Sequence, residues 1–179
     1  MRFLPLLLLL VLGGAGAQAP TAESHDFGVP PASELRQTDL SSPTPTQLPG
    51  ARVITTPELR RLLQAPLEER PLLFDVLGGD DGHATLPGTI WLPGAGRGAS
   101  FDDEVQARLE KLLAFAMRGS PERPLVFFCS SPRCWLSYNA ALRAVRLGYR
   151  DVRWYRGGIE AWGASGGALA PPRVTWQRP

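Results

Sequence analysis

The chain has 179 residues, 44% of them hydrophobic and 20% charged, which suits one globular domain with extensions and excludes a wholly disordered chain. Its 19 basic and 17 acidic residues nearly balance, so we expect neither nucleic acid nor a membrane surface as a partner. The two cysteines, Cys129 and Cys134, lack further ligands at zinc-site spacing. We therefore expect no metal and no cofactor.

The first 17 residues have the pattern of a secretory signal peptide. Arg2 precedes an apolar run over 3–12, and small residues follow at 15–17. The run is shorter than the about 20 apolar residues that a membrane-spanning helix needs, so an uncleaved anchor is the less favoured alternative. We expect cleavage after Ala17, a periplasmic protein free of the membrane, and a disulfide as the resting state of the cysteines.

Residues 18–50 form a lead-in that is rich in Pro, Ser and Thr. We expect an extended or disordered linker here, although such a segment can also lie against a domain. From Arg52 onward, strand and helix patterns alternate, which is typical of an α/β fold with a central, mainly parallel sheet flanked by helices. We expect the domain to span 51–164, with its last strand at 151–155 and a tail over 165–179.

Two local patterns predict where a strand ends and where a helix begins. The run at 71–77 is apolar without alternation, as in a strand buried on both faces, and Asp75 ends it at the carboxyl edge of the sheet. A helical pattern follows at 104–117, for which Ser100 or Asp102 is a suitable N-cap.

The stretch from Pro124 to Tyr149 organises the rest of the chain. An apolar strand over 125–128 leads to Cys129, a polar loop follows, and a helical pattern begins beside Cys134. Strand, loop and helix place the loop at the carboxyl edge of a parallel sheet, where it faces a helix N-terminus. Loop amides and that N-terminus would favour a thiolate or persulfide anion on Cys129, and Arg133 adds positive charge.

Four pieces of the chain together resemble the rhodanese-like family, over roughly Val53 to Trp162. They are LLFDVL, GHATLPGTIWLP, the cysteine that follows a strand, and YRGGIEAW. The resemblance implies a rhodanese-like fold and identifies Cys129 with the catalytic cysteine of sulfurtransferases. It assigns His83 to a structural turn, so His83 is not expected to act as a base.

A narrower resemblance rests on WLPGAGRG, on the proline-rich lead-in and on a run containing Cys134, Trp135, Ser137 and 139–141. These features resemble exported rhodanese-like proteins with a CXXCW motif that are associated with alcohol catabolism by enzymes using pyrroloquinoline quinone (PQQ). That resemblance implies a quinoprotein dehydrogenase, a cytochrome c or a thiol-redox protein as partner.

The chain departs from these patterns in the cysteine loop. Ser130, Ser131, Pro132 and Arg133 separate the cysteines, no glycine is present, and Leu77 stands where active rhodaneses commonly carry arginine. These departures favour a redox or a binding role over sulfur transfer by Cys129 alone. Because a disulfide across so short a loop stabilises a fold by only about 2 kcal/mol, we prefer a redox pair, with Cys129 attacking and Cys134 resolving. A permanent disulfide in a non-catalytic binding module is the third alternative.

The remaining candidate residues are expected to support the loop. Trp135 fits packing better than a place in the pocket wall, and Ser137 can cap the helix or donate to the loop. Arginines also gather in the last part of the chain, where a solvated helix face is favoured over an anion site; they are Arg143, Arg146, Arg150, Arg153 and Arg156.

Overall fold

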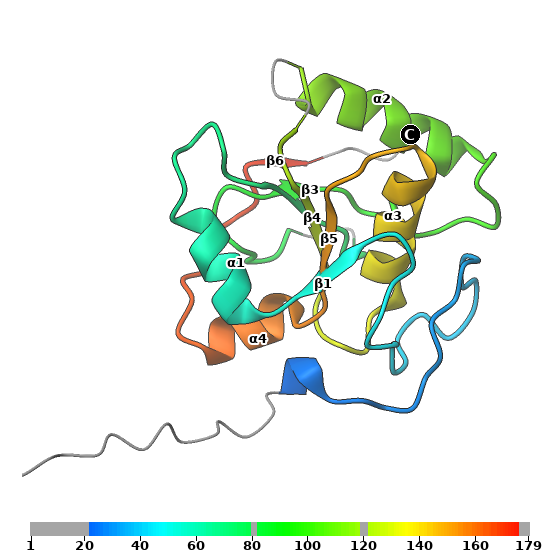
Figure 1. The fold of residues 1–179 in the computed structure, drawn as a ribbon, viewed down its shortest axis with the longest axis horizontal. Helices are drawn as coiled ribbons and strands as arrows, with labels where there is room; N and C mark the ends of the chain where they lie inside the picture. The colour runs from blue at the N-terminus through cyan, green and yellow to red at the C-terminus, as the bar shows by residue number, and fades with distance from the viewer. Residues whose placement is uncertain (1–21, 80–81, 119–121, 176–179) are drawn as a thin grey trace, which may run out of the picture.

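A computed structural model describes residues 22–79, 82–118 and 122–175, so the expected signal peptide, 1–17, lies outside the described residues. Its centre is a six-stranded sheet of order β1-β5-β4-β2-β3-β6, in which every strand pair is parallel (Figure 1). The strands are β1 Arg52–Ile54, β2 Leu72–Asp75, β3 Ile90–Trp91, β4 Leu125–Phe128, β5 Val152–Tyr155 and β6 Val174–Thr175. The α/β class and the parallel sheet are confirmed.

Helices cover both faces of the sheet (Figure 1). They are α1 Thr56–Leu63, α2 Glu104–Ala116, α3 Trp135–Arg146 and α4 Gly158–Ala164, with a short 3-10 helix, η1, at Ala22–Ser24. Phe127 of the central strand β4 packs in the core under α2 and α3, whereas Val126 and Phe128 pack in the core under α1 and α4. Because both of its faces are buried, β4 shows no polar alternation.

Two details of the secondary structure differ from the expectation: the last strand and the start of α2. The tail contains β6, which pairs with β3, so the prediction that the last strand lies at 151–155 was wrong. The N-cap of α2 is Asp103, whose Oδ1 accepts from the Gln106 amide at 2.9 Å, and not Ser100 or Asp102. A two-residue strand carries too little pattern to detect, and adjacent Asp residues are equally suitable caps on composition alone.

The lead-in lies against the domain, so the preferred interpretation of a plain linker was wrong. Leu35 and Leu48 are buried in the core on the α3 side of the sheet. The Tyr138 hydroxyl bonds both the amide and the carbonyl of Ala32 at 2.8 Å, and the Asn139 amide group likewise bonds both backbone groups of Arg36. Side chains of α3 thus satisfy backbone groups that a segment without regular structure cannot pair internally.

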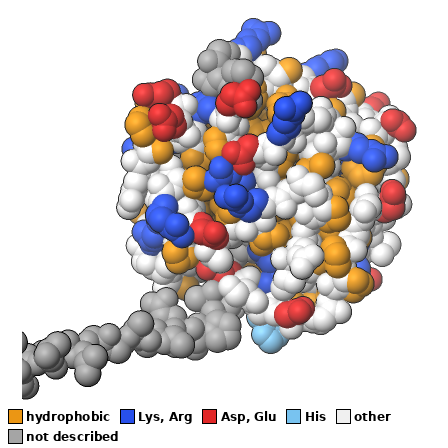
Figure 2. Space-filling view, in the orientation of Figure 1, with side chains coloured by type: hydrophobic (Ala, Val, Ile, Leu, Met, Phe, Trp, Pro, Cys, Tyr) orange, Lys and Arg blue, Asp and Glu red, His pale blue; other side chains and the backbone are white. Residues whose placement is uncertain are grey.

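The described helices include none that is both long and apolar enough to cross a membrane. Figure 2 shows basic and acidic side chains interspersed on the face in view, with hydrophobic atoms scattered between them.

Candidate functional site

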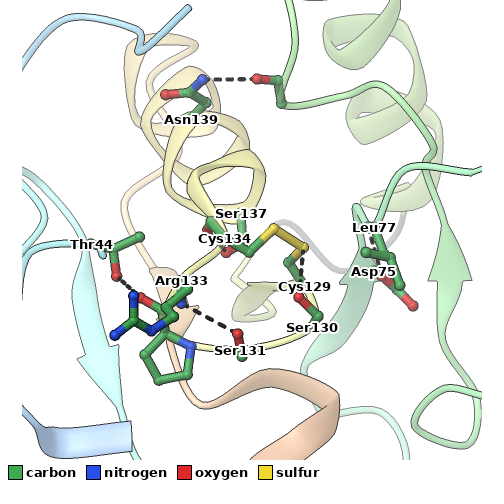
Figure 3. The surroundings of a disulfide bond; sticks show 12 residues. Thr44, Asp75, Leu77, Cys129, Ser130, Ser131, Arg133, Cys134, Ser137 and Asn139 are labelled. Carbon is green, nitrogen blue, oxygen red and sulfur yellow. Dashed lines mark hydrogen bonds between the residues drawn. A yellow bond between two sulfur atoms is a disulfide. The ribbon is translucent and has the colours of Figure 1, made fainter. Parts of the chain in front are cut away.

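Cys129 and Cys134 form a disulfide across the loop that follows β4 (Figure 3). Cys129 comes directly after the strand, and Cys134 is the N-cap residue of α3, with a Cα–Cα distance of 6.2 Å between them. Cys129 is 1% exposed and Cys134 is 6% exposed. The expected pairing of the two cysteines is therefore present, at the carboxyl edge of the sheet.

The first residues of α4 form hydrogen bonds with the cysteine loop. The amides of Ile159 and Glu160 donate to the carbonyls of Cys129 and Ser130 at 3.0 and 2.9 Å. Gly158, with φ of 62°, stands so close that a Cβ there would overlap the Cys129 carbonyl oxygen. Only glycine combines this left-handed conformation with so close an approach. The YRGGIEAW segment is thus a support for the cysteine loop.

Several loop amides are already engaged, contrary to the expectation that they hold an anion at Cys129. The amide of Cys134 donates to the Ser131 carbonyl at 3.1 Å, and that of Arg133 donates to Ser131 Oγ at 3.3 Å. Pro132 has no amide hydrogen. The Trp135 amide, in the first turn of α3, donates to the carbonyl of Leu40 at 2.9 Å. With the disulfide closed, these groups do not form an anion cradle.

The lead-in covers this loop. Both the amide and the hydroxyl of Thr44 donate to the Pro132 carbonyl, at 3.1 and 2.7 Å, and Trp135 Nε1 donates to the Pro43 carbonyl at 3.0 Å. Arg156, 2% exposed, then fastens the lead-in to the end of β5 through bonds to Thr44, Glu23 and His25. Burial lowers the pKa of Arg156, a change that arginine tolerates because its ordinary pKa is so high.

Asp75 supports the connection after β2 and has no hydrogen bond to the cysteine loop among the described residues. Its fully buried carboxylate accepts from the Leu77 amide at 2.8 Å and contacts His83 Nε2 at 2.6 Å. His83 also packs edge-on against Trp91, whose Nε1 donates to the Leu77 carbonyl. This arrangement agrees with a structural role for His83.

Trp135 and Ser137 are buried behind the loop. Trp135 is 2% exposed and packs against Tyr138, in agreement with the packing interpretation. Ser137 Oγ donates to the Cys134 carbonyl at 3.2 Å and accepts from Trp154 Nε1 at 2.9 Å. Ser137 therefore links the first turn of α3 to the sheet beneath.

The five arginines of the last part of the chain do not form one group. Arg143 is fully buried. Its guanidinium donates hydrogen bonds to the side chains of Asp103 and Gln106 and to backbone carbonyls of the loop that precedes α2. Burial raises the pKa of Asp103, but hydrogen bonds from Arg143 and from the Gln106 amide outweigh it, so the pKa is lowered. The interpretation of a solvated face was wrong for Arg143 and Arg156, because the sequence pattern does not distinguish a buried arginine from an exposed one.

A cavity of about 340 Å³ opens beside the disulfide. Its walls come from the lead-in, from the segments that follow β2, β3 and β4, and from α3; they are Ser41, Leu77, Gly78, Arg97, Ser130, Ser131, Arg133, Cys134 and Leu136. The loop residues were candidates from the sequence, but Ser41, Leu77 and Arg97 were not. Arg97 lies in the WLPGAGRG segment and Leu77 was noted only as a departure from active rhodaneses. A larger, more apolar cavity of about 560 Å³ lies between η1, α1 and α4 and is lined by neither cysteine.

A model of the rhodanese-like domain matches residues 55–165, which is more than half of the chain. The chain belongs to the rhodanese-like family. Among solved structures, it is similar to a thiosulfate sulfurtransferase from Pseudomonas aeruginosa, with 18% identity, a TM-score of 0.51, and coverage of 72% of this chain and 22% of that one. It is also similar to the BH2092 protein from Bacillus halodurans, with 22% identity, a TM-score of 0.48, and coverage of 67% and 77%.

The likeness to the sulfurtransferase concerns the fold alone, since the identity is 18% and the chain spans less than a quarter of that protein. No curated protein matches the chain.

Proposed function

We propose that this rhodanese-like protein carries out thiol–disulfide exchange through the Cys129–Cys134 pair. The observation that supports this is the disulfide itself. It lies in the loop after β4 and keeps the cysteine that follows the strand in its oxidised form. In this state Cys129 has no thiolate with which to accept sulfur, and the amides of 133–135 are engaged elsewhere.

The proposed reaction uses a thiol partner. A partner thiolate forms a bond to one cysteine sulfur, the Cys129–Cys134 bond breaks, and its electron pair leaves on the other sulfur. A second thiolate on the partner then displaces the protein, so the partner is oxidised to a disulfide and the pair is reduced by two electrons. A disulfide-bearing oxidant reverses these steps and restores the resting form.

A purely structural disulfide is the less favourable explanation. Closing a loop this short stabilises a fold by only about 2 kcal/mol in the chain-entropy model. The loop is already held by α4, through Ile159 and Glu160, and by the lead-in, through Thr44. A covalent link adds little to a segment with so many hydrogen bonds.

The proposal includes a cellular setting. We propose export to the periplasm and an accessory role in PQQ-dependent alcohol oxidation, with a quinoprotein dehydrogenase, a cytochrome c or a thiol-redox protein as partner. The support is the signal-like pattern of 1–17 and the resemblance of the run from Cys134 to Ala141 to the CXXCW proteins.

The test compares sulfur transfer with thiol exchange in one protein preparation. We expect the oxidised protein to be reduced reversibly by a dithiol, releasing two thiols per chain, and to make little thiocyanate from thiosulfate and cyanide. Rapid thiocyanate production that is lost in Cys129→Ala but kept in Cys134→Ala would contradict the proposal and favour a persulfide-forming sulfurtransferase.

A further inference from the structure

The geometry points to Cys134 as the sulfur that exchanges with partners, and to thiols carrying a negative charge as the partners that the site accepts. This inference rests on the proposed function and reverses the order expected from the sequence, in which Cys129 attacks and Cys134 resolves.

The first observation is the access to each of the two cysteine residues. Cys134 lines the cavity of about 340 Å³ beside the loop, and Cys129 is not among the lining residues. The exposed fractions agree, at 6% for Cys134 and 1% for Cys129. A nucleophile must approach the sulfur it attacks, so the cavity directs an incoming thiolate to Cys134.

The second observation is the position of Cys134 as the N-cap residue of α3, a helix of 12 residues. The positive end of the helix dipole lies at this residue and not at Cys129, five positions earlier. Once the disulfide opens, this field favours the thiolate form of Cys134, which is the form that attacks the next disulfide. Cys129 is then the buried resolving thiol.

The third observation is the charge of the cavity. Arg97 and Arg133 both line it, both are exposed, and neither forms an ion pair with a carboxylate within the described ranges. The guanidinium carbon of Arg133 lies 4.9 Å from the centre of the Phe27 ring, a cation–π contact that supplies no negative charge. Two arginine residues in the lining of an open cavity favour a ligand with a carboxylate near its thiol.

The thiolate of the partner, R–S⁻, bonds to Cys134 Sγ, the Cys134–Cys129 bond breaks, and Cys129 leaves as a thiolate that takes a proton from solvent. The product is a Cys134–S–S–R mixed disulfide, and the reverse attack by Cys129 releases the partner thiol.

Mass spectrometry of the full-length protein identifies the attacked sulfur. The oxidised protein is treated with 3-mercaptopropionate, quenched with acid, alkylated and digested with trypsin. Cleavage after Arg133 separates the cysteines, with Cys129 in the peptide ending at 133 and Cys134 in the peptide over 134–143. We expect at least ten times more adduct on the second peptide. An equal distribution, or an excess on Cys129, would overturn the inference.

A second experiment tests the preference for charge and needs no cysteine substitution. Rates of disulfide opening are measured with 3-mercaptopropionate, 2-mercaptoethanol and cysteamine, which are anionic, neutral and cationic, each corrected for its thiolate fraction. We expect each of Arg97→Gln and Arg133→Gln to slow the anionic thiol about fivefold relative to the neutral one, the effect of one unit charge at about 4 Å in water.

The matched control is Arg61→Gln, which removes an exposed arginine from α1, on the other face of the sheet. We expect this variant to keep the wild-type ratio of rates, and 1 M salt to abolish the preference in the wild type. If the ratio of the anionic to the neutral thiol rate is the same in the wild type and in all three variants, the charge preference is overturned.

The two levels of the proposal can fail separately. If the disulfide is too reducing to exchange under physiological conditions, the proposed function fails, yet Cys134 in a Cys129→Ser variant would still react with an anionic aromatic disulfide. If the pair exchanges readily but through Cys129, only the present inference fails.

Discussion

Arg156→Met tests whether the lead-in is fastened over the cysteine loop. The wild-type guanidinium donates four hydrogen bonds of 2.7–3.1 Å to Glu23, His25 and Thr44. Hydrogen bonds to a charged group contribute about 1.5–3 kcal/mol each, so their loss would cost about 6–12 kcal/mol if the lead-in stayed in place.

Detachment of the lead-in is the less costly outcome. It returns the three carbonyl groups to water, and water likewise replaces the partners that Tyr138, Asn139 and Thr44 lose. The remaining cost is the exposure of Leu35 and Leu48, at about 1.5–3 kcal/mol for each leucine, or about 3–6 kcal/mol together. We therefore expect Arg156→Met to lose at most this much stability and to open the lead-in without unfolding the sheet.

Limited proteolysis measures this opening. Trypsin cleaves after Arg36, and the cleavage rate follows the open population when opening is fast. A loss of about 3 kcal/mol in local stability corresponds to an increase of about 100-fold in that rate. The control is Arg153→Met, since Arg153 lies in β5, three residues before Arg156, and its side chain bonds only Asp151 among the described residues. Cleavage after Arg36 at the wild-type rate in Arg156→Met would refute the reasoning.

Three further substitutions test the support of the site. Gly158→Ala should destabilise the protein by about 2 kcal/mol or more, measured by denaturant unfolding, because it adds overlap with the loop carbonyl to the strain of a left-handed residue; Gly166→Ala, at a similar φ in open space, should show the strain alone. Ser137→Ala should cost about 1–3 kcal/mol and alter the tryptophan fluorescence, because Trp154 loses its acceptor. The pKa of Asp103 is lowered in the folded state. Its contribution to folding stability is therefore fully present above its ordinary pKa of about 3.9 and is lost as the pH falls through the folded value. We expect Asp103→Asn to make the loss of stability below about pH 4 less steep.

Each of these expectations can be contradicted. Equal unfolding free energies for Gly158→Ala and Gly166→Ala would show that the approach of α4 to the loop is not tight. A wild-type free energy in Ser137→Ala would mean that the indole finds another acceptor. An unchanged slope of stability against pH in Asp103→Asn would show that other carboxylates account for the acid response.

The sequence predicts the sheet well because a strand that is buried on both faces appears as an uninterrupted apolar run. The runs at 71–74 and 125–128 are apolar throughout, and Asp75 and Cys129 follow them at the same edge of the sheet. The strand β6 leaves no such trace, since two residues held by one neighbouring strand need no distinctive composition.

The position of the cysteine site was also predictable, but its surroundings were not. Strand, loop and helix place Cys129 and Cys134 by local rules alone. The covering of the loop depends instead on Tyr138, Asn139 and Arg156, whose partners are backbone groups of a distant, irregular segment. Backbone acceptors are the same for every residue type, so no sequence pattern reveals such bonds.

The reduction potential of the Cys129–Cys134 pair tests the proposed function most directly. The protein is equilibrated in glutathione redox buffers, its free thiols are trapped with an alkylating reagent, and the reduced fraction is measured by mass. Thiol–disulfide exchange predicts a potential near about −200 mV or above, within the range of disulfide-exchanging proteins. A potential well below about −300 mV would contradict the proposal and identify a permanent structural disulfide.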